Sequence, residues 1–233
     1  QNIRNQQKEY IPQLYKFAQI VLATNKNSVK YATAGTPKKF WTVWKEQDTD
    51  FLKDALARYI HDRIPTEQDR NLISLFTPAR VMELIRYFVL FDANVKKICR
   101  YQQYFAIQEI IKTIQQPDEK GNRQSGVIWH TQGSGKSFSM VFFSKLLQQA
   151  MSSPTIVVLT DRNDLDGQLY RQFACCRDFL RQTPVQAESR AHLRELLAGR
   201  EANGIFFSTM QKFEESEEPL SIRRNIVVMA DEA

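Results

Sequence analysis

Short apolar runs that alternate with helical segments constrain the fold of this chain more than any other feature. Four such runs occur in the second half, at residues 126–130, 155–160, 204–209 and 226–230. Runs of this length, apolar at nearly every position, are typical of parallel strands that are buried on both faces. Helical patterns fill the intervals, at residues 137–150 and 166–174 and between Ser189 and Gly199. The alternation predicts an α/β fold with a doubly wound parallel sheet.

A glycine-rich loop follows the first apolar run and reads His130-Thr131-Gln132-Gly133-Ser134-Gly135-Lys136-Ser137. The phosphate-loop pattern requires a glycine, four residues, and then Gly-Lys-Ser/Thr. The last three positions match, whereas His130 replaces the first glycine. A bare Gly-Lys-Ser is common by chance, but its place between a predicted strand and a predicted helix makes it specific. We therefore expect a nucleotide site at this loop.

Each part of the loop has a physical reason to bind a nucleoside triphosphate. Gly133 and Gly135 allow tight turns, so successive backbone N–H groups can point at phosphate oxygens. The helix that follows adds the positive end of its dipole. Lys136 supplies a point charge to the β- and γ-phosphates, and the Ser137 hydroxyl can ligate Mg²⁺. With ATP and Mg²⁺ as cofactors, the predicted binding residues are Thr131, Gln132, Gly133, Ser134, Gly135, Lys136 and Ser137.

The last apolar run ends in two carboxylates, Asp231 and Glu232. Ligands of open α/β sheets bind at the carboxyl ends of the strands, which is where these side chains are expected. Asp231 can hold Mg²⁺, and Glu232 can polarise the attacking water. Alone, the pair would be an ordinary polar strand end. Combined with the loop, it predicts a hydrolytic site in which Lys136 and Glu232 are the catalytic residues.

The first hundred residues contain patterns typical of both strands and helices. Apolar runs at residues 20–22 and 28–33 flank an Asn-rich turn and predict a β-hairpin. Residues 49–61 have the periodicity of an amphipathic helix. A further helix is predicted from Thr77, a capping residue, to Val89. We interpret residues 46–99 as a helical linker.

Charge and composition narrow the class of protein. The net charge is +6, and residues 1–100 hold 17 Lys and Arg against 10 Asp and Glu. This excess hints at contact with nucleic acid, although from charge alone ordinary surface charge is the favoured explanation. No run of 18 apolar residues occurs, so no membrane span is expected.

The three cysteines (Cys99, Cys175 and Cys176) form neither a disulfide framework nor a zinc site, which favours a reducing cytoplasm. Because the chain starts with Gln and stops directly after an apolar run, we expect an excerpt from a longer protein.

The order of the motifs resembles a known family. The ending Asp231-Glu232-Ala233 is similar to motif II of superfamily two helicases. The segments His130-Thr-Gln-Gly-Ser-Gly-Lys-Ser137, Thr160-Asp-Arg-Asn-Asp-Leu-Asp-Gly-Gln168 and Thr209-Met-Gln-Lys-Phe213 together resemble the R subunit of type I restriction-modification enzymes. In that family His is usual at position 130, so the missing glycine supports the match.

The resemblance implies a domain organisation and further site residues. Residues 100–233 would be most of the first RecA-like motor domain, cut at motif II, and residues 1–45 the α+β tail of a nuclease domain. The family's nuclease helix carries Gln-x-x-x-Tyr, but Asn5 stands where the Tyr would follow Gln1, and the nuclease carboxylates would lie upstream. Gln103 would read adenine. The DNA-binding residues would be Arg162, Thr209, Gln211 and Lys212.

The family's activity would be ATP-driven translocation along double-stranded DNA, in complex with methyltransferase and specificity subunits. Two alternatives stay open. One is another superfamily two DNA or RNA helicase, against which the Thr160–Gln168 segment argues. The other is a nucleotide-dependent interaction module without motor activity. The DNA recognition sequence and the step of translocation do not follow from the sequence.

Overall fold

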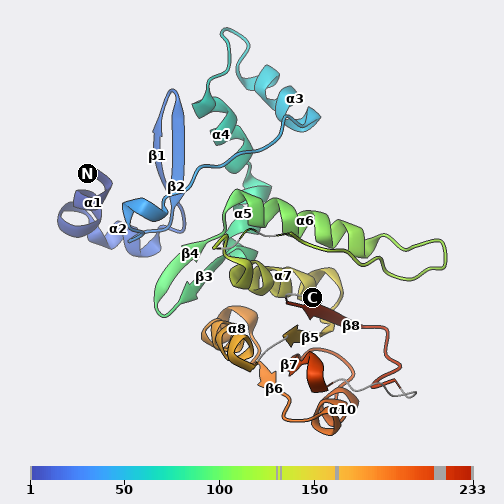
Figure 1. Ribbon diagram of the computed structural model, residues 1–233. Helices are drawn as coiled ribbons and strands as arrows, with labels where there is room; N and C mark the ends of the chain where they lie inside the picture. Colours follow the sequence, from blue (N-terminus) through green and yellow to red (C-terminus); the bar gives the residue numbers. More distant parts are fainter. Residues whose placement is uncertain (1, 130, 132, 161–162, 213–218, 232–233) are drawn as a thin grey trace. The chain divides into compact units, whose positions relative to one another are not determined.

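The computed structural model describes residues 2–129, 131, 133–160, 163–212 and 219–231, with the backbone alone at residues 2, 163–166 and 212. The chain forms two compact units, residues 1–106 and 107–233, which are called here the N-terminal and the C-terminal unit. Figure 1 gives the labels of the elements. The division falls within helix α6 (Tyr101–Gln115), and the boundaries expected at residues 45/46 and 99/100 stay predictions.

The N-terminal unit contains short helices and two β-hairpins. Its elements are α1 (Asn2–Asn5), η1 (Gln6–Tyr10), α2 (Pro12–Phe17), β1 (Val21–Asn25), β2 (Ser28–Ala32), η2 (Lys38–Phe40), α3 (Asp50–Tyr59), α4 (Glu67–Leu75), α5 (Pro78–Tyr87), β3 (Val89–Asp92) and β4 (Val95–Ile98). The first hairpin confirms the prediction from the Asn-rich turn, because β1 and β2 pair antiparallel up to Asn25 opposite Ser28.

Residues 46–99, interpreted above as a helical linker, differ from that interpretation because α5 ends early and a β-hairpin follows it. Helix α5 ends at Tyr87, and Val89 begins strand β3 instead of continuing the helix. Strands β3 and β4 pair across a two-residue turn in which Ala93 and Asn94 both have positive φ, 46° and 65°. That turn geometry matches the twist of antiparallel strands. A single sequence gives little sign of it, because Ala at a positive-φ position is uncommon.

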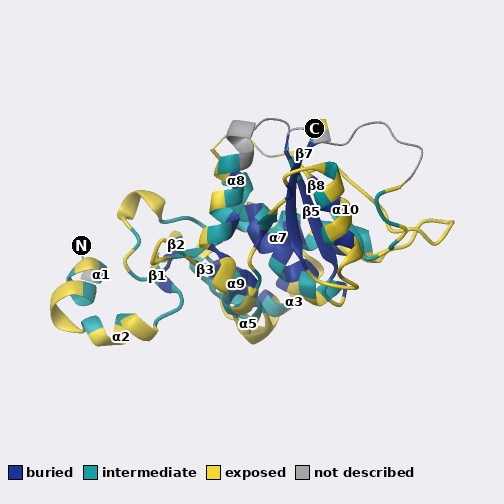
Figure 2. Cartoon of the chain, turned by 90° about the horizontal axis from the view of Figure 1, so that it is seen from below, coloured by how far each residue is buried: buried dark blue, intermediate teal, exposed yellow. Residues whose placement is uncertain are grey.

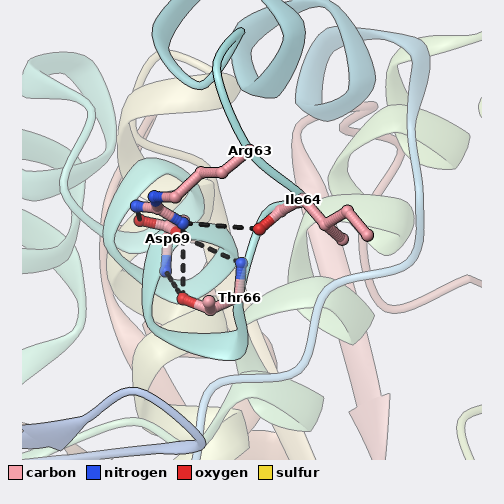
Figure 3. A network of polar contacts seen from close by, with 4 residues as sticks. All are labelled: Arg63, Ile64, Thr66 and Asp69. Carbon is pink, nitrogen blue, oxygen red and sulfur yellow. Dashed lines mark hydrogen bonds and ion pairs between the residues drawn. The ribbon is translucent and has the colours of Figure 1, made fainter.

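Helix α4 was also not predicted, although its start carries a recognisable signal. Figure 3 shows the capping box. The Thr66 N–H donates to Asp69 Oδ2 at 2.8 Å, and the Asp69 N–H donates back to Thr66 Oγ1 at 3.4 Å. Arg63 adds two hydrogen bonds to the same carboxylate, at 2.5 and 2.8 Å. The hydrogen bonds from Arg63 and then those from Thr66 lower the pKa of Asp69 well below its ordinary value.

A half-buried cation, Arg80, lies among aromatic rings in the N-terminal unit. The Arg80 guanidinium lies 5.6 Å from the Trp44 ring, 5.3 Å from Tyr104 and 5.7 Å from Phe105. It forms a short hydrogen-bonded ion pair with Glu46, whose side chain is only 6% exposed. We call these five residues the Arg80 cluster. Burial opposes the charge of Arg80, but the hydrogen bond and charge of Glu46 outweigh it, so the pKa of Arg80 is raised.

The C-terminal unit is built around a parallel sheet. Its strands are β5 (Thr155–Thr160), β6 (Val185–Gln186), β7 (Ile205–Thr209) and β8 (Ile226–Ala230), in the spatial order β6-β7-β5-β8. All three strand pairs are parallel, as the alternating pattern predicts. The remaining elements are α7 (Lys136–Ala150), α8 (Asn163–Cys175), α9 (Arg177–Leu180), α10 (Arg190–Ala198) and η3 (Met210–Lys212). Figure 2 shows α7 and α8 on one side of the sheet and α10 on the other.

Apolar packing against α10 stabilises one face of the sheet. Val157 on β5 and Phe206 on β7 pack with Leu193 and Leu197 of α10 and with Ala187 in one buried cluster. Burying side chains of this size contributes about 1.5–3 kcal/mol each. The rigid sheet that results fixes where its strand ends lie.

One predicted strand is wrong in the described structure. Residues 126–129 have no regular secondary structure, and His130 lies outside the described residues. Val127 is 99% exposed and Trp129 90% exposed. A strand requires a neighbour for its backbone groups, and among the described strands β8 pairs with β5 alone. An apolar run therefore was not sufficient to add a strand to the sheet.

Candidate functional site

Two residues that are far apart in the sequence meet at the carboxyl edge of the parallel sheet. Lys136 Nζ lies 2.6 Å from Asp231 Oδ1, and the two side chains are 39% and 13% exposed. Lys136 is the first residue of α7, and Asp231 directly follows β8. The sequence analysis expected both residues at one ligand, and the structure brings them into contact.

Backbone geometry at the start of α7 explains how the loop presents its amides. Gly133 and Gly135 have φ of 74° and 90°, in the left-handed region that glycine adopts without strain. Gly135 is the N-cap of α7, and the Ser134 N–H donates to Thr131 O at 3.1 Å in the turn before it. The first N–H groups of an α-helix have no partner within the helix, so a 15-residue helix that begins here offers donors and a positive dipole end to an anion.

The strand ends bring further polar groups to this edge. The Asp231 N–H donates to Leu159 O at 2.8 Å, which ties the end of β8 to β5. Thr160 comes one residue after Leu159 and is 1% exposed. Its hydroxyl has no hydrogen-bond partner among the described residues. Most buried hydroxyls in proteins have a hydrogen-bond partner, either in the protein or in ordered water. The sequence analysis did not single out Thr160, although its place at the end of an apolar strand was the available signal.

The other predicted site residues have different outcomes. Gln132, Arg162 and Glu232 lie outside the described residues, as does the side chain of Lys212. Thr209 is 2% exposed, so its hydroxyl is not presented to a phosphate backbone in this conformation. Gln211, in contrast, is exposed. Ser137 is the second residue of α7 and is half-buried.

Gln103 belongs to the N-terminal unit and has a local structural role there. Its Oε1 accepts a hydrogen bond from the Arg100 N–H at 2.8 Å, and the side chain closes the first turn of α6. The residue is 5% exposed. This capping contact explains a polar, buried glutamine at the start of a helix. Adenine reading by Gln103 stays a prediction.

The residues of the edge fit a magnesium nucleotide. Glycine-turned amides and a lysine suit phosphate oxygens, and carboxylate and hydroxyl oxygens such as those of Asp231 and Ser137 suit a hard cation. Within the described ranges, no group of three or more His, Cys, Asp or Glu side chains could hold a metal by itself. Mg²⁺ is usually held by one or two carboxylates together with phosphate oxygens of the nucleotide, and Asp231 suits that arrangement.

Among the helices that the structure describes, none combines the length and the apolar character that a membrane span requires.

A parallel α/β sheet with a phosphate loop opposite a strand-end carboxylate defines the class of phosphate-loop ATPase domains. Residues 102–233 match the SWI2/SNF2 ATPase family, and the chain belongs to that family. The chain is also similar to the endonuclease subunit of the HindI type I restriction enzyme of Haemophilus influenzae, with 43% identity over 97% of this chain and 22% of the relative. The SauCOLORF180P endonuclease subunit of Staphylococcus aureus is 28% identical over 72% of this chain and 17% of the relative.

These relatives support the resemblance drawn from the motifs. The chain is a helicase-family protein similar to the endonuclease (R) subunit of type I restriction enzymes. It spans about a fifth of the length of the curated relatives that it matches.

Proposed function

We propose that this chain is the ATP-binding part of a motor that translocates double-stranded DNA, within a type I restriction endonuclease subunit. The observation that carries the proposal is the 2.6 Å contact between Lys136 and Asp231 at the carboxyl edge of the sheet. Membership of an ATPase family and similarity to restriction subunits support the same assignment.

In this proposal the residues of the loop hold the triphosphate. Backbone N–H groups of the loop around Gly133 and Gly135 bind the phosphates, and Lys136 stabilises the negative charge that develops on them during transfer. Ser137 and Asp231 hold Mg²⁺, which, when bound, neutralises phosphate charge. Glu232 orients the attacking water and accepts its proton. Gln103 contributes adenine recognition, as the family resemblance implies.

Loops after the strands are the proposed contact to DNA. The phosphate backbone is contacted by Arg162, Gln211 and Lys212, and such contacts bind DNA without sequence preference. Thr209 joins them once the end of β7 moves, because its side chain is buried in the present conformation. Sequence recognition is left to a specificity subunit, which together with a methyltransferase subunit completes a cytoplasmic complex.

The test is ATP hydrolysis by the intact protein with its partner subunits, measured with and without double-stranded DNA. We expect DNA to stimulate turnover, and stimulation to require DNA that carries an unmethylated recognition site. A rate of ATP hydrolysis that is the same with and without DNA would favour a nucleotide-dependent interaction module. Stimulation by any DNA or RNA, regardless of partner subunits and methylation, would favour a different superfamily two helicase. Either result would overturn the restriction assignment.

A further inference from the structure

The positive charge of the chain is concentrated at its start. Residues 1–45 hold eight Lys and Arg side chains against a single acidic one, Glu9, whereas residues 46–233 hold 24 against 25. The whole excess of positive charge therefore comes from the first 45 residues. Among the described residues, none of these eight cations forms an ion pair with a carboxylate. The carboxylates that follow directly, Glu46 and Asp48, have arginine partners further along the chain.

Two of these cations, Lys30 and Lys45, share one face of the β1–β2 hairpin. The Tyr31 N–H donates to Thr42 O at 2.8 Å and the Thr42 N–H donates back to Tyr31 O at 3.1 Å, so the segment after Thr42 runs back along β2 toward its first residue. The buried rings of Tyr31 and Trp44 pack together, with centroids 5.8 Å apart. Because successive side chains of an extended chain point to opposite sides, Lys30 and Lys45 both point to the solvent side, and both are exposed.

Three more lysines extend this face at its two ends. Lys26 is exposed in the turn of the hairpin, and its carbonyl accepts a hydrogen bond from the Gln68 N–H at 3.3 Å, which holds the turn against α4. Lys38 and Lys39 are exposed in η2, which precedes Thr42 and therefore lies toward the other end of β2. We give the name lysine face to the set Lys26, Lys30, Lys38, Lys39 and Lys45.

The lysine face suits a chain of phosphates better than a single anion or a membrane. Its charges are spread along a strand of five residues, which is about 17 Å long at the usual rise and matches about five phosphates of one DNA strand. The side chains beside Lys30 on the solvent side of the hairpin are small or polar, namely Ala23, Asn25 and Ser28. Helices that bind membrane surfaces carry large apolar side chains instead, whereas amide and hydroxyl groups donate readily to phosphate oxygens.

We propose that the lysine face binds the phosphate backbone of double-stranded DNA without reading its sequence. This inference goes beyond the proposed function, which assigns DNA contacts to loops of the C-terminal unit alone. The lysines act as point charges, so the affinity that they add comes from the release of counterions and falls steeply as salt is raised. Because no residue of the nucleotide site belongs to the face, this contact holds DNA whether or not a nucleotide is bound.

The place of the contact is tested by lysine acetylation of the intact protein, measured by mass spectrometry with and without a short DNA duplex. The duplex should protect the five residues of the lysine face, equally with and without Mg·ADP. Lys53 and Lys112 are the controls, because their side chains are 60% and 65% exposed and lie outside the face. Both controls should stay reactive when the duplex is present.

The energetic consequence is tested by the affinity of the intact protein for the same duplex over a range of salt concentrations. One variant replaces three residues of the face, Lys26→Gln, Lys30→Gln and Lys45→Gln. Each lost phosphate contact should lower the slope of log affinity against log salt by about 0.9, so three should lower it by about 2.7. At about 0.1 M salt the affinity should fall at least tenfold, since each such contact contributes about eightfold between 1 M and 0.1 M.

A control variant loses the same charge elsewhere, through Lys53→Gln, Lys112→Gln and Lys120→Gln, and should keep the wild-type slope. An equal change of slope in both variants would overturn the proposal, because net charge alone would then act. So would lysines of the face that are already unreactive before DNA is added, that stay reactive with it, or that are protected by vesicles of anionic phospholipid but not by the duplex. None of these results bears on hydrolysis at the nucleotide site, so the proposed function stands or falls separately.

Discussion

The Arg80 cluster gives the sharpest quantitative test of the N-terminal unit. Arg80→Met keeps an unbranched apolar stem like that of Arg but removes the guanidinium and its charge. Glu46, 6% exposed, would lose its cation; among the described residues, Trp44 Nε1 would still donate a long hydrogen bond to it, at 3.4 Å. Breaking a buried ion pair in this way costs about 3–5 kcal/mol. Loss of the cation–π contacts adds about 0.5–1 kcal/mol. Because Arg80 keeps 17% exposure, its ion pair costs less than a fully buried one, and we expect a total loss of about 3 kcal/mol.

Native-state hydrogen exchange of the intact protein measures this loss locally. The Tyr31 N–H donates to Thr42 O at 2.8 Å, and the Tyr31 ring lies against Trp44. A loss of about 3 kcal/mol predicts more than a hundredfold faster exchange of that amide. The control is the double variant Glu46→Gln with Arg80→Met, which removes the buried charge and should recover most of the protection. Exchange that is unchanged in Arg80→Met, or equally fast in both variants, would refute the reasoning.

Three further predictions concern local features. Because the pKa of Asp69 is lowered, its stabilisation of the start of α4 is complete above the ordinary pKa of Asp, near 4, and is lost as the pH falls through the lowered value. Hydrogen exchange of the Thr66 amide, corrected for its intrinsic pH dependence, should become faster over that pH range. Trp129→Phe should remove most of the iodide-quenchable fluorescence, because Trp129 is 90% exposed. Gly204→Ala should destabilise the protein by about 2 kcal/mol in urea unfolding, since φ is +96° and the new Cβ would meet the buried Phe206 ring at 2.7 Å.

Each of these has a matched control. Asp118→Asn removes another carboxylate with a lowered pKa and should leave α4 unchanged. Trp44 is 2% exposed, so Trp44→Phe should leave iodide quenching almost intact. Gly121 has φ of +76° and open space around it, so Gly121→Ala should be milder than Gly204→Ala. Blue-shifted, protected emission from Trp129 would show that residues 126–129 pack as a strand after all.

Much of the C-terminal unit could be predicted because its signals are local. Three apolar runs became parallel strands, and parallel strands bring their carboxyl ends to one edge. That rule was sufficient to expect Asp231 near the loop at Lys136. The hairpin at residues 21–32 could likewise be predicted from its turn residues.

The features that were missed depend on contacts between distant segments. Nothing near Arg80 in the sequence indicates that Trp44 and Glu46 surround it. The β3–β4 turn uses positive φ at Ala93, which residue preference does not favour. Residues 126–129 had the composition of a strand, but composition does not supply the neighbour that a strand needs. The ion pair at the site was also unexpected, because Lys136 and Asp231 were assigned to different ligands.

The most direct test of the central claim is ATP turnover by the intact protein, with its partner subunits and DNA, after Lys136→Ala. The account predicts that hydrolysis falls to background, while the control Lys145→Ala, a lysine further along the same helix α7, keeps its turnover. Undiminished hydrolysis in Lys136→Ala would contradict the assignment of the triphosphate to this loop, and with it the proposed motor.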